Sequence, residues 1–150
     1  MLLMKRAERT GDPWSGHIAL PGGGYQFEDR DLLATAIRET HEELGIDLSR
    51  EQLLGNLAPL SPRAAEPALI EVTPFVFRTE AAPEATCGPE AFSAFWLPLE
   101  LARSGALDGI YRYPVTSGDP LTFPSWSYDG HAIWGLTLRI LNDLLAAATP

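Results

Sequence analysis

A chain of 150 residues, of which 45% are hydrophobic and 21% charged, has the size and composition of one globular domain with a buried core. Its formal net charge of −9 argues against duplex nucleic acid or an anionic membrane as the main partner. No run of about 18 apolar residues is present, and the opening MLLMKR is too short for a signal peptide. Cys87 is the single cysteine, which favours a reducing compartment. We therefore expect one cytoplasmic domain over residues 1–150, although the abrupt strand at the start leaves room for a longer natural amino terminus.

The amino-terminal part is predicted to contain two strands that lead into a glycine turn. Met1–Lys5 has the apolar pattern of a short buried strand, and Arg6–Ser15, with its Gly-Asp-Pro sequence, is typical of an exposed loop. Gly16–Leu20 predicts a second strand. It runs into Pro21 and three consecutive glycines, 22–24, which allow a sharp turn that brings backbone carbonyls close to a ligand.

A helix that carries an acidic cluster is predicted next, and Gly45 is expected to end it. Glu39, Glu42 and Glu43 share one face, because positions i, i+3 and i+4 of a helix lie within an arc of about 100°. The adjacent face is apolar and can dock on a sheet. Its members are Leu33, Ala36, Ile37, Thr40 and Leu44.

Three like charges this close together repel one another, and a bound cation would relieve the repulsion. Carboxylate oxygens are hard ligands that suit Mg²⁺ or Mn²⁺, and these ions in turn hold substrate phosphates. Arg38 lies four residues before Glu42 and can fix the orientation of that carboxylate. The alternative is an acidic helix face that is simply solvated.

Two further strands are predicted in the middle of the chain. Leu53–Leu60 indicates a strand whose prolines place it at an edge or end of a sheet. Ala68–Arg78 is rich in apolar and β-branched residues and is predicted to join the central sheet, with Pro74 marking an irregularity.

The last third is predicted to contain an aromatic strand, a hairpin and a helix. Pro89–Leu101 has an acidic start, an aromatic strand and a proline exit, and Asp108–Tyr128 suggests a hairpin and loop. Asp129 is predicted to cap a final helix over His131–Ala147. The dense aromatics of the hairpin region, Trp126 and Tyr128 among them, would wall a substrate pocket, fill the core, or contact a second copy in a homodimer.

The stretch 21–46, PGGGYQFEDRDLLATAIRETHEELGI, resembles the signature of the Nudix hydrolases. That signature reads Gly, five residues, Glu, seven residues, then Arg-Glu-apolar-x-Glu-Glu-x-Gly-apolar. The second half matches from Arg38 to Ile46. In the first half Asp29 stands where Glu is usual, and eight residues separate it from Arg38. The resemblance implies an α/β fold, a Nudix-type α/β/α sandwich with a mixed central sheet.

A further pattern resembles the coenzyme A diphosphatase branch of this family, approximately LLTxR(S/A)xxxRxxxGxxxFPGG. The matching residues are Leu2, Leu3, Arg6, Ala7, Gly16, Pro21, Gly22 and Gly23. Arg9 is the nearest candidate for the second arginine of the pattern, and either arginine could contact an anionic substrate group or lie solvated at the surface. Glu90 stands eight residues before Pro98, as an acidic residue does in this branch.

The resemblance also implies roles for individual residues. Glu42 and Glu43 would be the principal ligands of Mg²⁺ or Mn²⁺, with a carbonyl of Gly22 or Gly23 completing the shell. Glu39 would be a ligand or the general base, and Glu90 the competing base. We assign Arg38 to orienting carboxylates.

The activity predicted is hydrolysis of a small-molecule diphosphate, with coenzyme A or an acyl derivative as the first hypothesis. ADP-ribose or another nucleoside diphosphate sugar is the second. The third is a binding or regulatory module that hydrolyses nothing, although such a module has no need to keep a repulsive carboxylate cluster.

Overall fold

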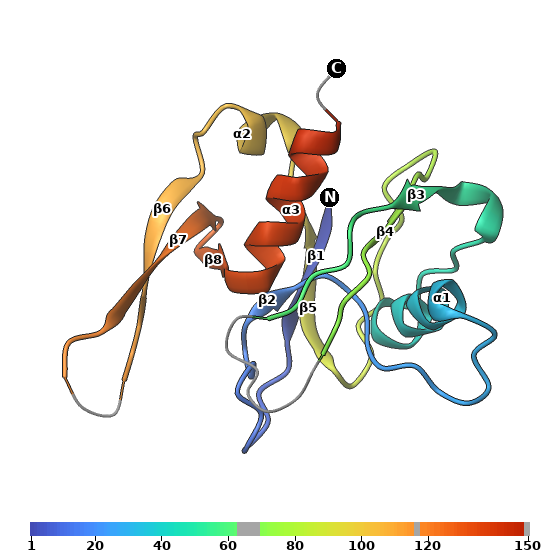
Figure 1. The fold of residues 1–150 in the computed structure, drawn as a ribbon, viewed down its shortest axis with the longest axis horizontal. Helices are drawn as coiled ribbons and strands as arrows, with labels where there is room; N and C mark the ends of the chain where they lie inside the picture. The colour runs from blue at the N-terminus through green and yellow to red at the C-terminus, as the bar shows by residue number, and fades with distance from the viewer. Residues whose placement is uncertain (63–69, 116–117, 149–150) are drawn as a thin grey trace.

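The computed structural model describes residues 1–62, 70–115 and 118–148, and within them short strands alternate with three α-helices (Figure 1). In chain order the elements are β1 (Leu2–Arg6), β2 (Ile18–Ala19), α1 (Leu32–Leu44), a 3₁₀ turn (Arg50–Gln52), β3 (Leu53–Asn56), β4 (Phe75–Phe77), β5 (Ala91–Trp96), α2 (Leu99–Arg103), β6 (Asp108–Tyr113), β7 (Leu121–Tyr128), β8 (His131–Trp134) and α3 (Gly135–Ala147).

Strand β1 organises the layers because two successive residues, Leu3 and Met4, face opposite ways, as alternation along a strand requires. Leu3 and Met4 are both fully buried. Leu3 joins the cluster beneath α3, whereas Met4 packs with Leu44 and Ile46 on the side of α1. The sheet β2–β1–β5 therefore lies between α1 and α3, as Figure 1 shows. This layering confirms the predicted α/β class.

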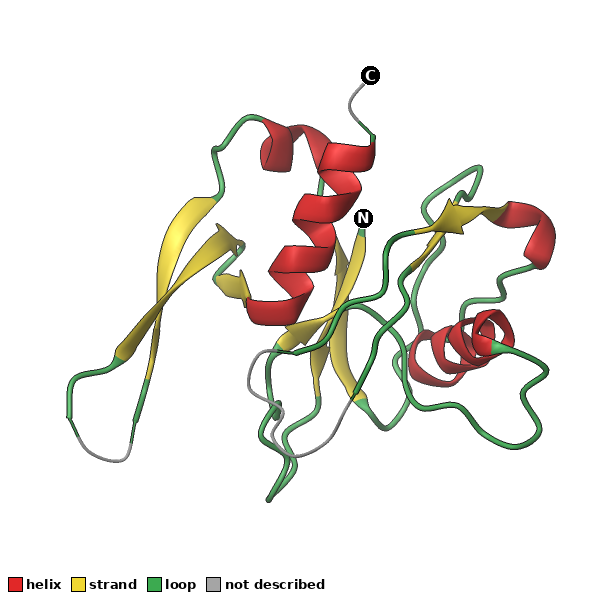
Figure 2. Ribbon diagram, viewed as in Figure 1, coloured by secondary structure: helices red, strands yellow, loops and turns green. Residues whose placement is uncertain are grey.

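The described strands form three small sheets, coloured yellow in Figure 2, rather than the one mixed sheet that we expected. They are β2–β1–β5, β3–β4 and β6–β7–β8, and each ladder between described strands is antiparallel.

The expected strand 68–78 is wrong in its extent and in its place. Residues 68 and 69 lie outside the described residues, and only Phe75–Phe77 forms a strand, which pairs with β3 and not with the central sheet. Proline has no N–H to donate to a ladder. The carbonyl of Pro74 still accepts from the N–H of Leu57, at 2.9 Å, but pairing before it is reduced to a single bridge between Val72 and Leu60.

The final helix begins at Gly135, four residues later than predicted, and Asp129 does not cap it. Asp129 and Gly130 both have positive φ, 48° and 75°, and form the two-residue turn between β7 and β8. An Asp-Gly pair with two positive φ values is a preferred hairpin connection. Residues 131–134 consequently continue as a strand before α3 starts.

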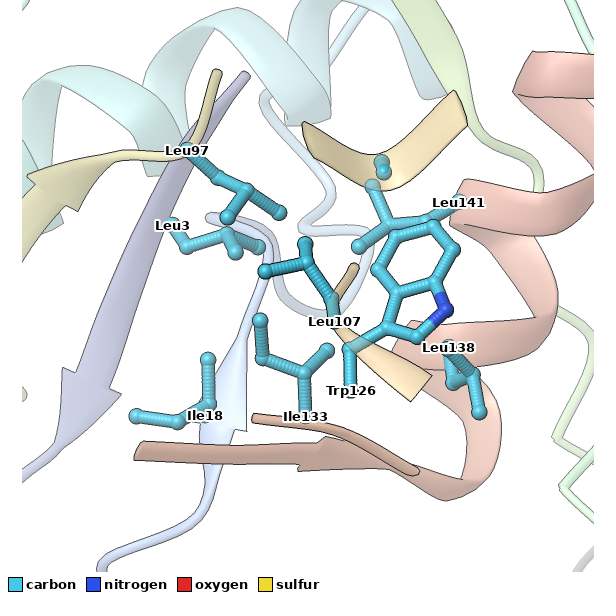
Figure 3. Packing of buried hydrophobic residues seen from close by; sticks show 9 residues of the cluster. Leu3, Ile18, Leu97, Leu107, Trp126, Ile133, Leu138 and Leu141 are labelled. Carbon is cyan, nitrogen blue, oxygen red and sulfur yellow. The ribbon is translucent and has the colours of Figure 1, made fainter. Parts of the chain in front are cut away.

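The larger core cluster lies between the central sheet, the last two strands and α3 (Figure 3). Its buried members are Leu3, Ile18, Leu97, Ala102, Leu107, Trp126, Ile133, Leu138 and Leu141. Burying a side chain of this kind stabilises a fold by about 1.5–3 kcal/mol. Within the described parts of the chain, no helix is long and apolar enough to cross a membrane.

Candidate functional site

Helix α1 presents the acidic residues on a well-defined frame. The Asp31 carboxylate accepts a hydrogen bond from the N–H of Ala34 at 2.8 Å, which satisfies one of the free donors at the helix start. Gly45 has a φ of 63° and ends the helix, as predicted, with its N–H donating to the carbonyl of His41. Regular geometry between these ends places Glu39, Glu42 and Glu43 on one side.

The structure brings the three glutamates of α1 together with Glu90. All four line one open pocket of about 160 Å³, together with Pro89. Glu90 reaches it because the chain before β5 docks on the last turn of α1. The N–H of Gly88 donates to the carbonyl of Glu43 at 2.8 Å. We call this space the acidic pocket.

Glu43 is the most enclosed of these carboxylates, with a residue exposure of 2%. Burial raises the pKa of its carboxyl to about 7, since water no longer solvates the charged form, and the neighbouring charges of Glu39 and Glu90 add to the rise. A hydrogen bond from the N–H of Gly22, at 2.8 Å, opposes it. The first glycine of the turn therefore orients Glu43.

Arg38 connects the carboxylates on both sides of it. Its Nη1 donates to Glu39 at 2.9 Å and to Glu42 at 3.1 Å, while Nε and Nη2 both donate to Asp29 at 3.0 Å. Nη2 also donates to the carbonyl of Gly24 at 3.1 Å. The sequence predicted the contact with Glu42, and the structure adds Asp29 as the anchor of the guanidinium.

The sequence did not predict this role of Asp29. Its position in the first half of the signature was the one feature that could have indicated it. The residue is 7% exposed, and it also accepts from the backbone N–H of Gln26 and the hydroxyl of Thr35. Arg38 and these donors hold the pKa of Asp29 well below its usual range, and Asp29 raises the pKa of Arg38 in turn.

The glycine turn approaches Glu39 very closely. A Cβ added at Gly23 would lie 2.5 Å from the carboxyl carbon of Glu39, whereas one at Gly24 would meet nothing within 4 Å. Gly23 thus permits a contact that a side chain would prevent. The prediction that a carbonyl of Gly22 or Gly23 binds a metal stays a prediction.

The two candidate arginines lie beside this site. Arg9 pairs with Glu90 at 3.3 Å, and both side chains are about half exposed, so the pair contributes little to stability. Arg6 pairs with Asp12 at 2.8 Å, and its buried Nε has no hydrogen-bond partner among the described residues.

The two candidate aromatic residues lie elsewhere. Trp126 is 4% exposed and packs in the core, so the prediction that it binds substrate is wrong. Strand β7 turns it inward beside Leu107, Leu138 and Leu141 (Figure 3), because aromatic area is most stabilising when buried. Tyr128 packs at the edge of the same cluster, with its ring 6.0 Å from that of Phe95, and it does not line the acidic pocket.

The donor set of the acidic pocket fits a hard divalent ion without forming a ready-made cage. Across residues 1–62, 70–115 and 118–148, no three Asp, Glu, His or Cys side chains converge closely enough to hold a metal. Two of the carboxylates, Glu39 and Glu42, are engaged by Arg38. Magnesium is usually bound by one or two carboxylates, several waters and substrate phosphates, and carboxylates are the donors that this pocket offers.

Comparison with known proteins agrees with this description. A profile of the NUDIX domain matches residues 1–115. The chain is 33% identical over 145 residues to a protein of Photorhabdus laumondii described as an uncharacterized Nudix hydrolase NudL, covering 95% of this chain and 74% of the relative. A protein of Yersinia pestis with the same description is 34% identical over 149 residues, covering 96% and 70%.

Among solved structures, a MutT/Nudix family protein from Enterococcus faecalis has the same fold, with a TM-score of 0.60 at 16% identity. The match covers 97% of this chain and about half, 54%, of that structure's chain. These findings confirm the predicted Nudix-type fold. The chain belongs to the Nudix family of hydrolases, whose members generally use divalent metal ions.

Proposed function

We propose that this chain is a metal-dependent diphosphohydrolase that cleaves the diphosphate of coenzyme A or an acyl-coenzyme A. The observation that carries the proposal is the acidic pocket, in which Glu39, Glu42, Glu43 and Glu90 lie beside the glycine turn. The choice of coenzyme A rests on the resemblance of the amino-terminal pattern around Arg6, since the relatives are described only as Nudix hydrolases. A single domain, a cytoplasmic location and a homodimer stay predictions.

Mg²⁺ or Mn²⁺, when bound, supplies neutralisation of the phosphate oxygens and a lowered pKa for water. In this proposal Glu42 and Glu43 would hold the ion, and the N–H of Gly22 fixes the Glu43 carboxylate. Arg38 steers Glu42 through a bond of 3.1 Å while Asp29 holds its guanidinium in place. Either Glu39 or Glu90 takes the proton of the attacking water, since both line the pocket.

The arginines of the preceding loop are proposed to meet the substrate. The side chain of Arg6 is a quarter exposed and its Nε has no partner among the described residues, so a turn of this side chain would offer that donor to a phosphate oxygen. Arg9 lies at the rim on Glu90 and can exchange that exposed contact for a phosphate.

The test is incubation with Mg²⁺ or Mn²⁺ and a panel of diphosphates, followed by identification of the products. Cleavage of coenzyme A to 4′-phosphopantetheine and adenosine 3′,5′-bisphosphate is expected. Preferred turnover of ADP-ribose would replace the substrate assignment, and inertness towards the whole panel would overturn the proposal in favour of a binding module. Glu42→Gln should abolish turnover in a folded protein, and undiminished activity would refute its role as a metal ligand.

A further inference from the structure

A second pocket is lined by residues of β1, β2, β6 and β8 and of the turns that precede β2 and β8. Its volume is about 260 Å³, and the side chains that matter for its chemistry are Lys5, His17, Tyr111, His131 and Trp134. Pockets for whole drug-sized ligands begin at about 300 Å³. This space therefore suits one end of a larger molecule.

Aromatic rings form the walls of this pocket. The indole of Trp134 stacks with the ring of Tyr111 at a centroid distance of 4.6 Å, and the imidazole of His17 meets it edge-on at 5.1 Å. His131 is stacked on Phe95 at 4.8 Å. Rings held in place by other rings give a rigid apolar lining, which favours a flat heterocycle as ligand.

The charge of this pocket is opposite to that of the acidic pocket. None of the described residues that line it is Asp or Glu, in a protein whose net charge is −9. The amine of Lys5 lies 5.0 Å from the ring centroid of Phe92, and none of the ion pairs among the described residues includes it. Asp12, whose charge acts on His17, is already paired with Arg6 at 2.8 Å. The lysine charge is thus left for an anion.

The end of β1 connects the linings of the two pockets. Lys5 lines the second pocket, and the next residue, Arg6, donates its backbone N–H to the carbonyl of His17 at 2.9 Å. One residue further, the N–H of Ala7 donates to the carbonyl of Glu90, which lines the acidic pocket. Two residues of extended chain span about 7 Å, which is within the reach of a nucleotide.

We propose that the second pocket binds the adenine and 3′-phosphate end of the substrate while the diphosphate lies in the acidic pocket. Lys5 pairs with the 3′-phosphate, an imidazole nitrogen of His17 adds a hydrogen bond, and the stacked pair of Tyr111 and Trp134 offers one aromatic face to the purine. The inference rests on the proposed function, because a 3′-phosphate distinguishes coenzyme A from ADP-ribose. It assigns substrate selection to residues outside the signature.

The kinetic test compares coenzyme A with 3′-dephospho-coenzyme A. A charge-assisted contact with phosphate contributes roughly a tenfold effect or more. Lys5→Met keeps the half-buried stem and removes the charge, so it should lower the ratio of kcat/KM for the two substrates about tenfold. Arg112→Met, the control, changes the net charge equally at an exposed position on the opposite face of β6 from Tyr111. It should leave the ratio unchanged.

A metal-free binding measurement separates this proposal from the hydrolytic one. Adenosine 3′,5′-bisphosphate added in EDTA should shift the imidazole NMR signals of His17 and His131, while His41, on α1, serves as the internal reference. If these shifts occur but coenzyme A is not cleaved, nucleotide binding in the second pocket is supported and only the proposed hydrolytic function is overturned. Equal kcat/KM for both substrates, or histidine signals that do not move, would overturn the proposed binding in the second pocket even if coenzyme A is cleaved.

Discussion

The substitution Gly23→Ala tests the glycine turn because it changes one atom beside one carboxylate. Gly23 and Gly24 both have φ outside the left-handed region, so alanine fits the backbone at either position. Only at Gly23 does the new Cβ meet a neighbour, at 2.5 Å from the carboxyl carbon and Oε1 of Glu39. Gly24→Ala is therefore a matched control.

The magnitude follows from that distance. Ordinary contact begins at 3.4 Å, so the Glu39 carboxylate has to move by about 0.9 Å and its 2.9 Å bond to Arg38 has to change. Metal–ligand distances tolerate deviations of about 0.2 Å, and misplacing a catalytic group by about 1 Å lowers the rate roughly 100-fold. We expect kcat/KM to fall about 100-fold, which corresponds to about 2.7 kcal/mol of transition-state stabilisation.

The Gly23→Ala variant should be more stable than the wild type although it is less active. The displaced group is the end of a flexible side chain, and replacing Gly by Ala restricts the unfolded chain, which adds about 0.4–1 kcal/mol where the backbone permits. The assay is kcat/KM on the diphosphate turned over fastest, with thermal unfolding of the same samples. Full activity of Gly23→Ala, or an equal loss in Gly24→Ala, would refute the reasoning.

Three further changes test the frame around the site. Gly88→Ala places a Cβ against the backbone carbonyl of Glu42, so it should lower both the melting temperature and the activity. Thermal unfolding and turnover measure the two effects, and a variant with wild-type values would contradict the close approach of Gly88 to α1. Ile133→Ala opens a cavity at a fully buried position and should cost about 2–5 kcal/mol in denaturant unfolding, against less than about 0.5 kcal/mol for Ile110→Ala at 73% exposure. The depressed pKa of Asp29 stabilises the fold above the unfolded pKa of about 3.9, and that contribution is lost as the pH falls below it. The stability deficit of Asp29→Asn should therefore be full at pH 7 and shrink below about pH 4, whereas a deficit independent of pH would show that Asp29 is not ionised in the pair.

The sequence by itself determined the features that depend on neighbours along the chain. The acidic face of α1 and its end at Gly45 follow from helical periodicity and from a backbone conformation that glycine adopts without strain. The Asp129-Gly130 pair is equally local: its sequence favours a hairpin turn, so the predicted helix cap at Asp129 was avoidable without the structure.

The tertiary structure alone decided which distant residues meet. Glu90 enters the acidic pocket because Gly88 packs on the end of α1, and Asp29 anchors Arg38 from a loop with no regular structure. Trp126 is a residue type that is common in binding sites, but in this fold it lies in the core. Burial depends on what the rest of the chain places opposite a side chain, and the periodicity of a single strand does not contain that information.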